Sequence, residues 1–380
     1  MKDAYVNRSL DTQFPRKIQA NKVMLILGAR RTGKTSFIKH FLKKLDVPYI
    51  KLNGEDQSTH KILETRTVAN YKKLMGKASY LIIDEAQKIP GIGVALKLMV
   101  DELDGIKIIV TGSSMFDLTN TLGEPLTGRK KTFYMFPFSQ AEYRGTETYP
   151  ETIAKLEERI IYGNYPELIR ITGHDDKVDY LNELVSDYLL KDILEMDSIR
   201  NSSKMFDLLR LIAFQTSNEV AYEELGRQLG VGKNTVERYL DLLSKVFVLF
   251  KVQGFSRNLR NEITKTSKWY FYDTGVRNAL MSNFNPLNLR NDTGYLWENF
   301  ILSERLKYQH TKSMSVNNYF WRTYQQQEID WIEDRGGKLH AYEFKWNGKK
   351  KVKMPITWKN AYPDSTFEVI TPENYLDWIT

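Results

Sequence analysis

The feature that most constrains the fold is a glycine-rich segment placed between an apolar run and a helical pattern. Residues 28–35 read Gly-Ala-Arg-Arg-Thr-Gly-Lys-Thr, which fulfils the pattern G-x-x-x-x-G-K-[ST]. Apolar residues precede it at 23–27, and a helical pattern follows at 36–45. A strand that passes through such a turn into a helix is the setting in which this pattern binds nucleotide phosphates. The alternative, a turn that binds nothing, does not account for this context.

The residue types in this loop fit phosphate binding. Glycines let consecutive backbone N–H groups point toward the phosphates, and the N-terminus of the following helix adds positive potential. We expect Lys34 to contact the β- and γ-phosphates of ATP and the Thr35 hydroxyl to hold Mg²⁺. The residues expected to bind ATP are Gly28, Ala29, Arg30, Arg31, Thr32, Gly33, Lys34, Thr35 and Ser36. The adjacent arginines are unusual there, and the sequence leaves open whether they contact phosphate or a neighbouring domain.

A second apolar run ends in two adjacent carboxylates. Residues 80–83 read Tyr-Leu-Ile-Ile, as expected of a strand buried on both faces of a parallel sheet, and Asp84 and Glu85 follow. We expect Asp84 to coordinate Mg²⁺ through water and Glu85 to orient and deprotonate the attacking water. The alternative is that both carboxylates cap the next helix. The phosphate loop upstream favours the catalytic interpretation.

Two further groups are candidates for contact with the γ-phosphate. An apolar run at 106–110 ends in Thr111, Gly112 and Ser113, so Thr111 or Ser113 is expected to hydrogen-bond the γ-phosphate or the attacking water. Turn formation is the alternative for these hydroxyls. Arg129 lies in the basic segment 127–131 and is a candidate arginine finger or sensor, either within its own subunit or on a neighbour. Solvent exposure is the alternative for Arg129.

Strand and helix signals alternate over the first 140 residues, which is typical of a parallel sheet with crossover helices. We therefore predict an α/β chain with four parts. Residues 1–137 form a P-loop NTPase core with a parallel sheet, and residues 138–205 form a helical lid. A winged helix-turn-helix at 206–282 and a C-terminal α/β domain at 283–380 complete the chain, which is too long for one core.

The winged helix is predicted from a helix at 222–229, a glycine turn at 230–232 and a second helix at 233–246. Segments 246–252 and 269–272 are the expected wing strands. Side chains expected to face DNA are Lys233, Asn234, Thr235 and Arg238 in the second helix and Arg257, Arg260, Lys265 and Lys268 in the wing. A protein-interaction or oligomerisation module is the alternative.

A second group of charged residues lies in the last hundred residues. Glu298 falls in a helical pattern at 294–309, Asp330 in a strand pattern, and Glu343 and Lys345 two residues apart on the returning strand. Such carboxylates can hold one or two Mg²⁺ ions for phosphodiester hydrolysis, with the lysine stabilising charge on the phosphate. From spacing alone, a solvated strand face is the favoured alternative. Lysines that extend the basic surface toward a nucleic-acid backbone are Lys349, Lys350, Lys351 and Lys353.

Composition sets broader limits. The formal net charge of +8 suits a polyanionic partner without proving one, and 42% apolar with 27% charged residues is typical of a globular chain. The sequence has no cysteine, which excludes disulfides, thiolate metal sites and a cysteine nucleophile. No stretch has the apolar length of a membrane span, and the N-terminus has no signal-peptide core, so we expect a cytoplasmic protein without a membrane partner.

Taken together, these motifs resemble a prokaryotic AAA-type ATPase family that is similar to the archaeal ATPases and carries a C-terminal domain of unknown function. The segments that carry the resemblance are residues 28–35, 81–87, 111–113, 128–129 and 137–142. The resemblance covers nearly the whole chain and implies an ATPase core, a winged helix and a domain related to the PD-(D/E)XK nuclease fold. The nuclease-like part of the match depends on Glu298, Asp330 and the segment 343–345. Many such domains have lost their chemistry, so nuclease activity stays open.

The leading hypothesis is an ATP-binding, Mg²⁺-dependent ATPase whose nucleotide state repositions the winged helix and the nuclease-like domain. The alternative is a DNA-binding or DNA-cleaving protein in which ATP is only a switch. A third interpretation is a signalling or interaction ATPase with a C-terminal docking surface. The expected cofactors are ATP and Mg²⁺, and the expected partners are DNA and a second copy of the chain.

Overall fold

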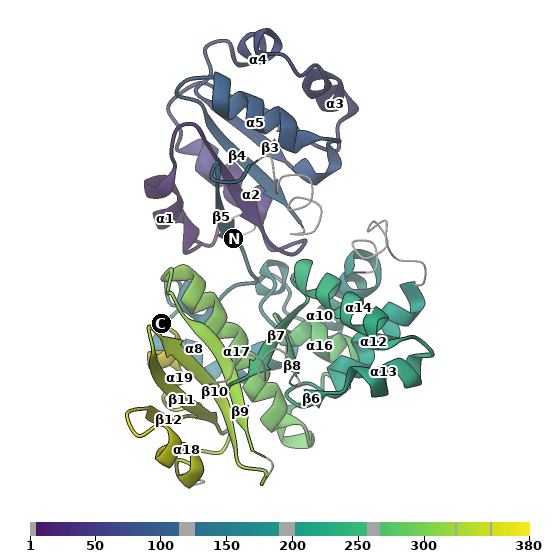
Figure 1. Ribbon diagram of the computed structural model, residues 1–380, viewed down its shortest axis with the longest axis vertical. Helices are drawn as coiled ribbons and strands as arrows, with labels where there is room; N and C mark the ends of the chain where they lie inside the picture. The colour runs from purple at the N-terminus through teal and green to yellow at the C-terminus, as the bar shows by residue number, and fades with distance from the viewer. Residues whose placement is uncertain (1–4, 114–125, 190–201, 257–266, 324, 350–351) are drawn as a thin grey trace. The chain divides into compact units, whose positions relative to one another are not determined.

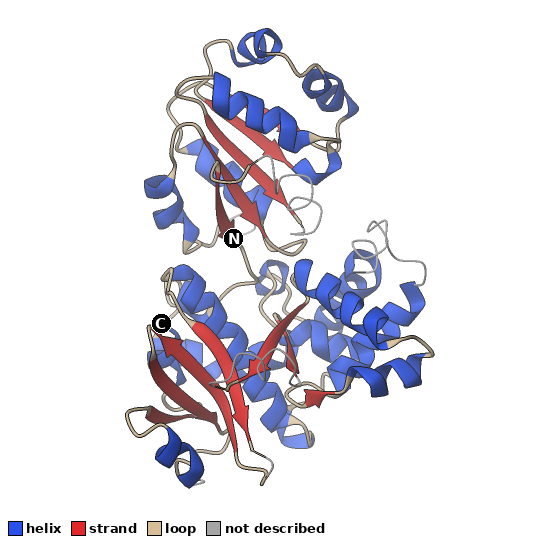
Figure 2. Cartoon of the chain, in the orientation of Figure 1, coloured by secondary structure: helices blue, strands red, loops and turns tan. Residues whose placement is uncertain are grey.

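The computed structural model describes residues 5–113, 126–189, 202–256, 267–323, 325–349 and 352–380. They form two compact units. The first comprises Met1–Phe136 with Lys245–Phe247, and the second comprises Pro137–Ser244 with Val248–Thr380. Each unit combines helices with a β-sheet, so the predicted α/β class is confirmed (Figures 1 and 2).

The first unit is built on a five-stranded parallel sheet with the order β2-β3-β4-β1-β5. Its strands are β1 (Lys22–Leu27), β2 (Tyr49–Asn53), β3 (Tyr80–Asp84), β4 (Lys107–Gly112) and β5 (Lys130–Tyr134). Both faces of the central strands are covered, which explains their nearly continuous apolar sequences. Because every pairing is parallel, the carboxyl ends of β1, β3 and β4 meet at one edge.

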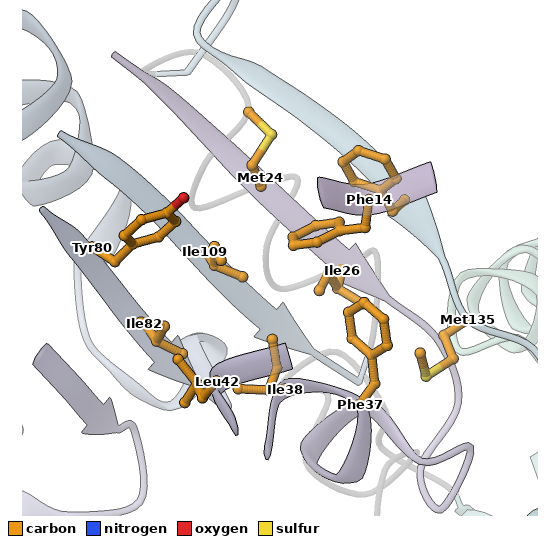
Figure 3. Packing of buried hydrophobic residues seen from close by; sticks show 11 residues of the cluster. Phe14, Met24, Ile26, Phe37, Ile38, Leu42, Tyr80, Ile82, Ile109 and Met135 are labelled. Atoms are coloured by element: carbon orange, nitrogen blue, oxygen red, sulfur yellow. The ribbon is translucent and has the colours of Figure 1, made fainter. Parts of the chain in front are cut away.

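Helices cover both faces of this sheet. They are α1 (Leu10–Lys17), α2 (Lys34–Lys43), α3 (Gln57–Glu64), α4 (Val68–Met75) and α5 (Ile92–Glu102). On one face Phe14 of α1 and Phe37 of α2 meet edge to face, with ring centroids 5.4 Å apart, above Ile26 and Ile109 of the sheet (Figure 3). This packing fixes α2, and with it the loop between β1 and α2, against the sheet.

The predicted strands at 23–27, 81–83 and 106–110 and the helix after the loop are confirmed. The sequence did not predict α3 or the edge strand β5. β5 begins at Lys130, inside the segment interpreted only as a basic element. It contains two lysines and is only partly buried, so its apolar signal is weak.

The second unit begins with short helices and continues through a helical region. Its helices are α7 (Gln140–Tyr143), α8 (Tyr149–Ala154), α9 (Leu156–Tyr162), α10 (His174–Glu183), the π-helix η3 (Leu184–Leu189), α12 (Ser202–Phe214), α13 (Tyr222–Leu229), α14 (Lys233–Lys245), α16 (Thr274–Leu280), α17 (Thr293–Thr311), α18 (Ile356–Ala361) and α19 (Tyr375–Ile379). Single 3₁₀ turns lie at Ala86–Lys88 in the first unit (η1) and at Pro166–Ile169 (η2) and Leu287–Leu289 (η4) in the second. The helices predicted at 222–229 and from residue 233 are present, and Gly230 joins them with φ +64°.

A seven-stranded mixed sheet with the order β12-β11-β10-β9-β7-β8-β6 runs through this unit (Figure 1). Its strands are β6 (Glu219–Val220), β7 (Leu249–Gly254), β8 (Ser267–Phe271), β9 (Asn317–Arg322), β10 (Glu328–Arg335), β11 (Lys338–Phe344) and β12 (Thr366–Ile370). β7 pairs in parallel with β9. The strands expected of two separate domains, 206–282 and 283–380, therefore belong to one sheet. Those boundaries and the one at 205 do not separate compact bodies in the structure.

Helix α17 contacts this sheet at β8 and at β11, each the strand next to an edge strand. The Asn299 side chain makes two hydrogen bonds to the backbone of Phe271 in β8. Its amide oxygen accepts from the Phe271 N–H, and its amide nitrogen donates to the Phe271 carbonyl, both at 2.8 Å. Ser303 donates to the carbonyl of Tyr272 at 2.6 Å. Most of the helix is buried, including several charged residues, so each buried charge needs a partner.

One of these partners is Glu333 of β10, whose side chain is fully buried. Its carboxylate accepts hydrogen bonds from Arg305 at 2.6 and 3.0 Å, and from Gln309, Trp331 and Arg335. Burial acts to raise the pKa of Glu333, but the hydrogen bonds and charges of the two arginines lower it to about 2. The ion pair therefore joins α17 to β10 without an unsatisfied carboxylate oxygen.

We predict that Glu333→Gln removes part of the acid sensitivity of the second unit. An unfolded glutamate has a pKa of about 4.3, so the depressed folded value stabilises the native state above that pH, by about 3 kcal/mol, and this is lost as the pH falls toward 2. Near neutral pH the variant should lose about 3–5 kcal/mol, because Arg305 keeps its buried charge without a countercharge. The difference in the free energy of unfolding between the variant and the parent chain should become smaller as the pH falls toward 2.

Denaturant unfolding as a function of pH measures this effect. The matched control is Glu368→Gln on β12, because that side chain is exposed. A pH-independent difference between Glu333→Gln and the parent chain would contradict the role assigned to the carboxylate.

Candidate nucleotide-binding site

The loop between β1 and α2 folds around the side chain of Lys34. Its ammonium group donates to the carbonyls of Gly28 at 2.7 Å and Ala29 at 2.9 Å, and the residue is buried. Thr32 closes the loop by donating to the Ala29 carbonyl at 2.9 Å. The lysine is thus held within the turn, and α2 begins at the same residue.

Backbone geometry explains the glycines of this loop. Gly33, the residue before α2, has φ +95°, a conformation that other residues rarely adopt. A Cβ atom at Gly28 would lie 2.0 Å from the carbonyl oxygen of Met135, so a larger residue does not fit. Arg31 takes φ +60°. Arg30 and Arg31 are both half-buried rather than fully solvated.

The carboxyl ends of β1, β3 and β4 bring three predicted residues together. The Thr35 hydroxyl donates to one oxygen of Asp84 at 3.0 Å, and the Thr111 hydroxyl donates to the other. The Thr111 oxygen also accepts from the backbone N–H of Glu85 at 3.1 Å. Thr111 is fully buried, so in this arrangement it positions Asp84 and Glu85 and presents no hydroxyl at the surface of the site.

Glu85 follows β3 in a left-handed conformation, with φ +51°. A Cβ atom at Gly54 would lie 2.1 Å from the Glu85 carbonyl oxygen, so the backbone is also confined from the β2 side. One oxygen of its carboxylate accepts from Gln87 Nε2 at 2.5 Å, and the same nitrogen lies 3.0 Å from Ser113 Oγ. Gln87 was not among the residues predicted for this site, although it lies only two positions after Glu85.

The structure does not bring Arg129 to this site. Its carbonyl accepts from the N–H of Val23 at the start of β1, whereas the loop follows the end of β1. Six strand residues separate the two edges, which is about 20 Å and beyond the reach of an arginine side chain. Its guanidinium instead pairs with Asp101 of α5, with Nε and Oδ1 2.6 Å apart. An arginine finger acting within the same subunit does not fit this geometry, and action on a neighbouring subunit stays a prediction.

The residues at the carboxyl edge fit a magnesium nucleotide. Thr35 and Asp84 supply oxygen atoms, which are the ligands that Mg²⁺ prefers. The glycine turn and the ammonium group of Lys34 lie at the N-terminus of α2, where phosphate binds favourably. Binding would require Lys34 to exchange its loop carbonyls for phosphate oxygens.

The second unit brings the other predicted group together. Asp330 of β10 accepts from the N–H of Phe344 at 2.9 Å and lies 4.0 Å from the ammonium group of Lys345. Lys345 also pairs with Glu343 at 2.7 Å. Burial raises the pKa of Asp330, which Lys345 partly opposes. Burial and the charge of Asp330 raise the pKa of Glu343.

Glu298 lies near a lysine of this unit, Lys268, which was predicted to face DNA in the wing. Lys268 of β8 is buried, and its ammonium group lies 2.5 Å from Glu328 and 3.7 Å from Glu298. Tyr270 donates to Glu298 at 2.6 Å. Burial raises the pKa of Glu298 despite the charge of Lys268. Residues 268 and 270 lie on the same face of the strand. This alternation was the one sequence signal that Lys268 would lie beside Tyr270 near Glu298.

Lys268 is therefore a second ammonium group near these carboxyl groups, in addition to Lys345, which was expected there. Within the described ranges, no three histidine, cysteine or acidic side chains are grouped so that they could hold a metal ion. Lys268 lies within ion-pair distance of Glu298 and Glu328, and Lys345 within ion-pair distance of Asp330 and Glu343. The assignment of Glu298, Asp330 and Glu343 as metal ligands stays a prediction that this arrangement does not support. Arg257, Arg260, Lys265, Lys350 and Lys351 lie outside the described residues.

No helix in the described part of the chain combines the length and apolar character needed to cross a membrane.

Three family models match consecutive parts of the chain. Residues 20–144 match a model described as an AAA domain. Residues 153–291 and 293–374 match two models described as domains of unknown function, DUF8612 and DUF4143. The match to the AAA domain thus covers most of the first unit, including the loop between β1 and α2. The other two descriptions assign no activity to the second unit.

Curated relatives and solved structures are more distant. The uncharacterized protein Rv2008c of Mycobacterium tuberculosis is 23% identical over 89% of this chain and 73% of its own length. MJ1544 of Methanocaldococcus jannaschii, also uncharacterized, is 24% identical over 79% of this chain and 69% of its own length. A signal transduction ATPase with a tetratricopeptide repeat sensor from Pyrococcus horikoshii has a TM-score of 0.31 at 12% identity, over 82% of this chain and 48% of that one. Bacteroides Pif1 bound to single-stranded DNA has a TM-score of 0.27 at 18% identity, over 48% of this chain and 50% of that one.

We predict that Lys268→Met destabilises the second unit by about 1–3 kcal/mol, because Glu298 would lose the nearby charge that opposes the effect of burial on its pKa, and the half-buried Glu328 would lose its ion-pair partner. Denaturant unfolding measures the loss. Lys251→Met on the neighbouring strand β7 is the control, since Lys251 is exposed. An unchanged midpoint in Lys268→Met would contradict the structural role. Recovery of stability on adding Mg²⁺ would show that the carboxylates can hold a metal ion once the ammonium group is removed.

Proposed function

We propose that the protein binds ATP at the loop of residues 28–36 and hydrolyses it in an Mg²⁺-dependent reaction. The observation that carries this proposal is the convergence of Lys34, Thr35, Asp84 and Glu85 at one edge of the parallel sheet. The match of residues 20–144 to the AAA domain supports it.

In the proposed reaction, the loop N–H groups and Lys34 bind the phosphates and stabilise the charge that develops on them. Thr35 would hold Mg²⁺ directly and Asp84 would hold it through water, and the ion would neutralise phosphate charge. Glu85 accepts a proton from the attacking water as the water adds to the γ-phosphorus, and ADP leaves from the opposite side. Thr111 keeps Asp84 and the Glu85 backbone in place.

We further propose that the nucleotide state repositions the second unit, including the helix pair α13–α14 and the strands after α17. The chain supplies a short connection. Met135 donates to the carbonyl of Leu27 at 2.7 Å, beside Gly28, and two residues later the chain enters the second unit. There the N–H of Gln140 donates to Glu304 of α17 at 2.7 Å. A shift of the loop would thus act on a segment that is anchored to α17.

The test is steady-state phosphate release with Lys34→Ala and Glu85→Gln. Lys34→Ala should weaken ATP binding about 10- to 100-fold, because charge-assisted hydrogen bonds to phosphate are lost. Glu85→Gln should keep ATP bound but lower turnover about 10²- to 10⁴-fold, because the base is lost. The control is Lys39→Ala, an exposed lysine on α2. Wild-type turnover that neither site variant reduces would refute the assignment.

The Glu85→Gln variant also tests repositioning. With ATP bound, amide hydrogen exchange at residues 135–140 should differ from that of the nucleotide-free protein. Identical exchange in both states would argue against coupling through this connection.

DNA binding by the second unit is a second candidate function. The order α12-β6-α13-α14-β7-β8, in which β8 pairs antiparallel with both β6 and β7, supports the proposal of a winged helix in this unit. Asn234 and Arg238 are exposed near the start of α14, where such modules contact DNA. Lys233 is also exposed but pairs with Glu223 at 2.6 Å. Cleavage has no comparable support, because the described residues contain no group of three histidine, cysteine or acidic side chains that could hold a metal ion.

We predict that Arg238→Ala weakens DNA binding. The slope of the logarithm of the binding constant against the logarithm of the salt concentration should become shallower by about one, as expected when one phosphate contact is lost. Fluorescence anisotropy with duplex DNA over a series of salt concentrations measures both values. Arg170→Ala is the matched control, because Arg170 is exposed in a loop of the same unit. Equal binding by Arg238→Ala and Arg170→Ala would exclude α14 as the DNA contact.

A further inference from the structure

We propose that Gln87 is a positioning residue that holds the carboxylate of Glu85 and links it to Ser113 at the end of β4. The inference deepens the proposed ATPase function and depends on it. Gln87 lies in η1, the single 3₁₀ turn (Ala86–Lys88) that follows β3, so its side chain returns toward the residue two positions earlier.

The geometry of one side-chain nitrogen carries the proposal. Gln87 Nε2 has two hydrogens, and it lies 2.5 Å from Glu85 Oε2 and 3.0 Å from Ser113 Oγ. Both hydrogens can therefore be donated at the same time, one to the predicted base and one to a residue of the neighbouring strand. Among the residues that the structure describes, no other side chain donates to the Glu85 carboxylate.

The backbone of Glu85 is fixed by other contacts, which leaves the side chain as the part that needs holding. Thr111 accepts from the Glu85 N–H at 3.1 Å, and Gly54 leaves no space on the β2 side of its carbonyl. The side chain itself is only half-buried and has three rotatable bonds. A general base must lie within hydrogen-bond reach of the proton that it removes, so a fixed carboxylate is more effective than a rotating one.

A purely structural role for Gln87 does not explain its contacts. The side-chain amide oxygen of Gln87, Oε1, is buried and has no hydrogen-bond partner among the described residues. Buried polar atoms in a residue kept for packing are normally satisfied. Only the donating end of the amide is used, and it is used on Glu85 and Ser113. A glutamine provides this donor without adding a charge next to the base.

The connection to Ser113 gives the contact a second consequence. Ser113 lies just beyond β4 and is buried, at the edge of the sheet where the phosphates are proposed to bind. A movement of β4 relative to β3 would therefore shift the amide and with it the carboxylate. Through this contact, the position of β4 affects the orientation of the Glu85 carboxylate.

The experiment compares Gln87→Met, which keeps the length of the side chain but cannot donate, with Gln87→Asn, which keeps the amide but is one methylene shorter. Both should lower kcat about 10- to 100-fold, with the KM for ATP and the melting temperature close to wild type. Gln57→Met, an exposed glutamine at the start of α3, is the matched control and should keep the wild-type kcat.

A double-variant comparison separates positioning from general damage. In the Glu85→Gln background, Gln87→Met should cause no further loss, because the group it positions has been removed. An equal loss in both backgrounds, or a wild-type kcat in Gln87→Met, would overturn the inference while leaving the ATPase proposal intact. If wild-type protein bound ATP but did not hydrolyse it, the ATPase proposal itself would fail, and the inference with it.

Discussion

The parallel pairing of β4 with both β1 and β3 is the constraint on which the nucleotide site depends. Because β4 lies between the other two strands, Leu27 of β1 pairs with Gly112, and Ile83 of β3 pairs with Val110. The loop, the acidic pair and the hydroxyl of Thr111 therefore end at the same edge. A strand order that separated β1 from β3 by more than one strand would leave Thr35 and Asp84 too far apart to share an ion.

The second unit depends on a different principle, the pairing of charge inside a buried layer. Helix α17 brings Glu298, Glu304 and Arg305 into the interior, where Lys268, Lys307 and Glu333 pair with them. Such pairs add little net stability compared with apolar residues, but removing one member leaves an isolated buried charge. The pairs Lys268–Glu298 and Glu333–Arg305 also restrict which strand can lie beside which face of the helix, whereas Lys307 and Glu304 pair within α17. This requirement accounts for a helix that is buried along most of its length without being apolar.

Most of the nucleotide site could be read from the sequence because its parts are local. The loop needs eight consecutive residues, and Asp84 and Glu85 follow an apolar run that is recognisable by itself. The second acidic group was found in part, since Asp330, Glu343 and Lys345 lie on two strands joined by a hairpin. The place of Lys268 in this group was not predicted, because its partners Glu298 of α17 and Glu328 of β10 are distant from it in sequence. Arg129 was misplaced because β5 is weakly apolar and was not predicted. Without that strand, the sequence did not show that Arg129 directly precedes a strand and therefore lies at the edge of the sheet opposite the loop.

The sequence by itself determined that the chain has a phosphate loop in a parallel α/β setting, because that motif and the alternation of strands and helices are written in short contiguous segments. Only the tertiary structure decided which charges meet. It sent Arg129 to the edge opposite the loop, placed an ammonium group among the carboxylates of the second unit, and joined Gln87 to the predicted base. The physical reason is that a charge or an amide acts through distances of a few ångströms, and strand order and register set those distances between residues far apart in the chain.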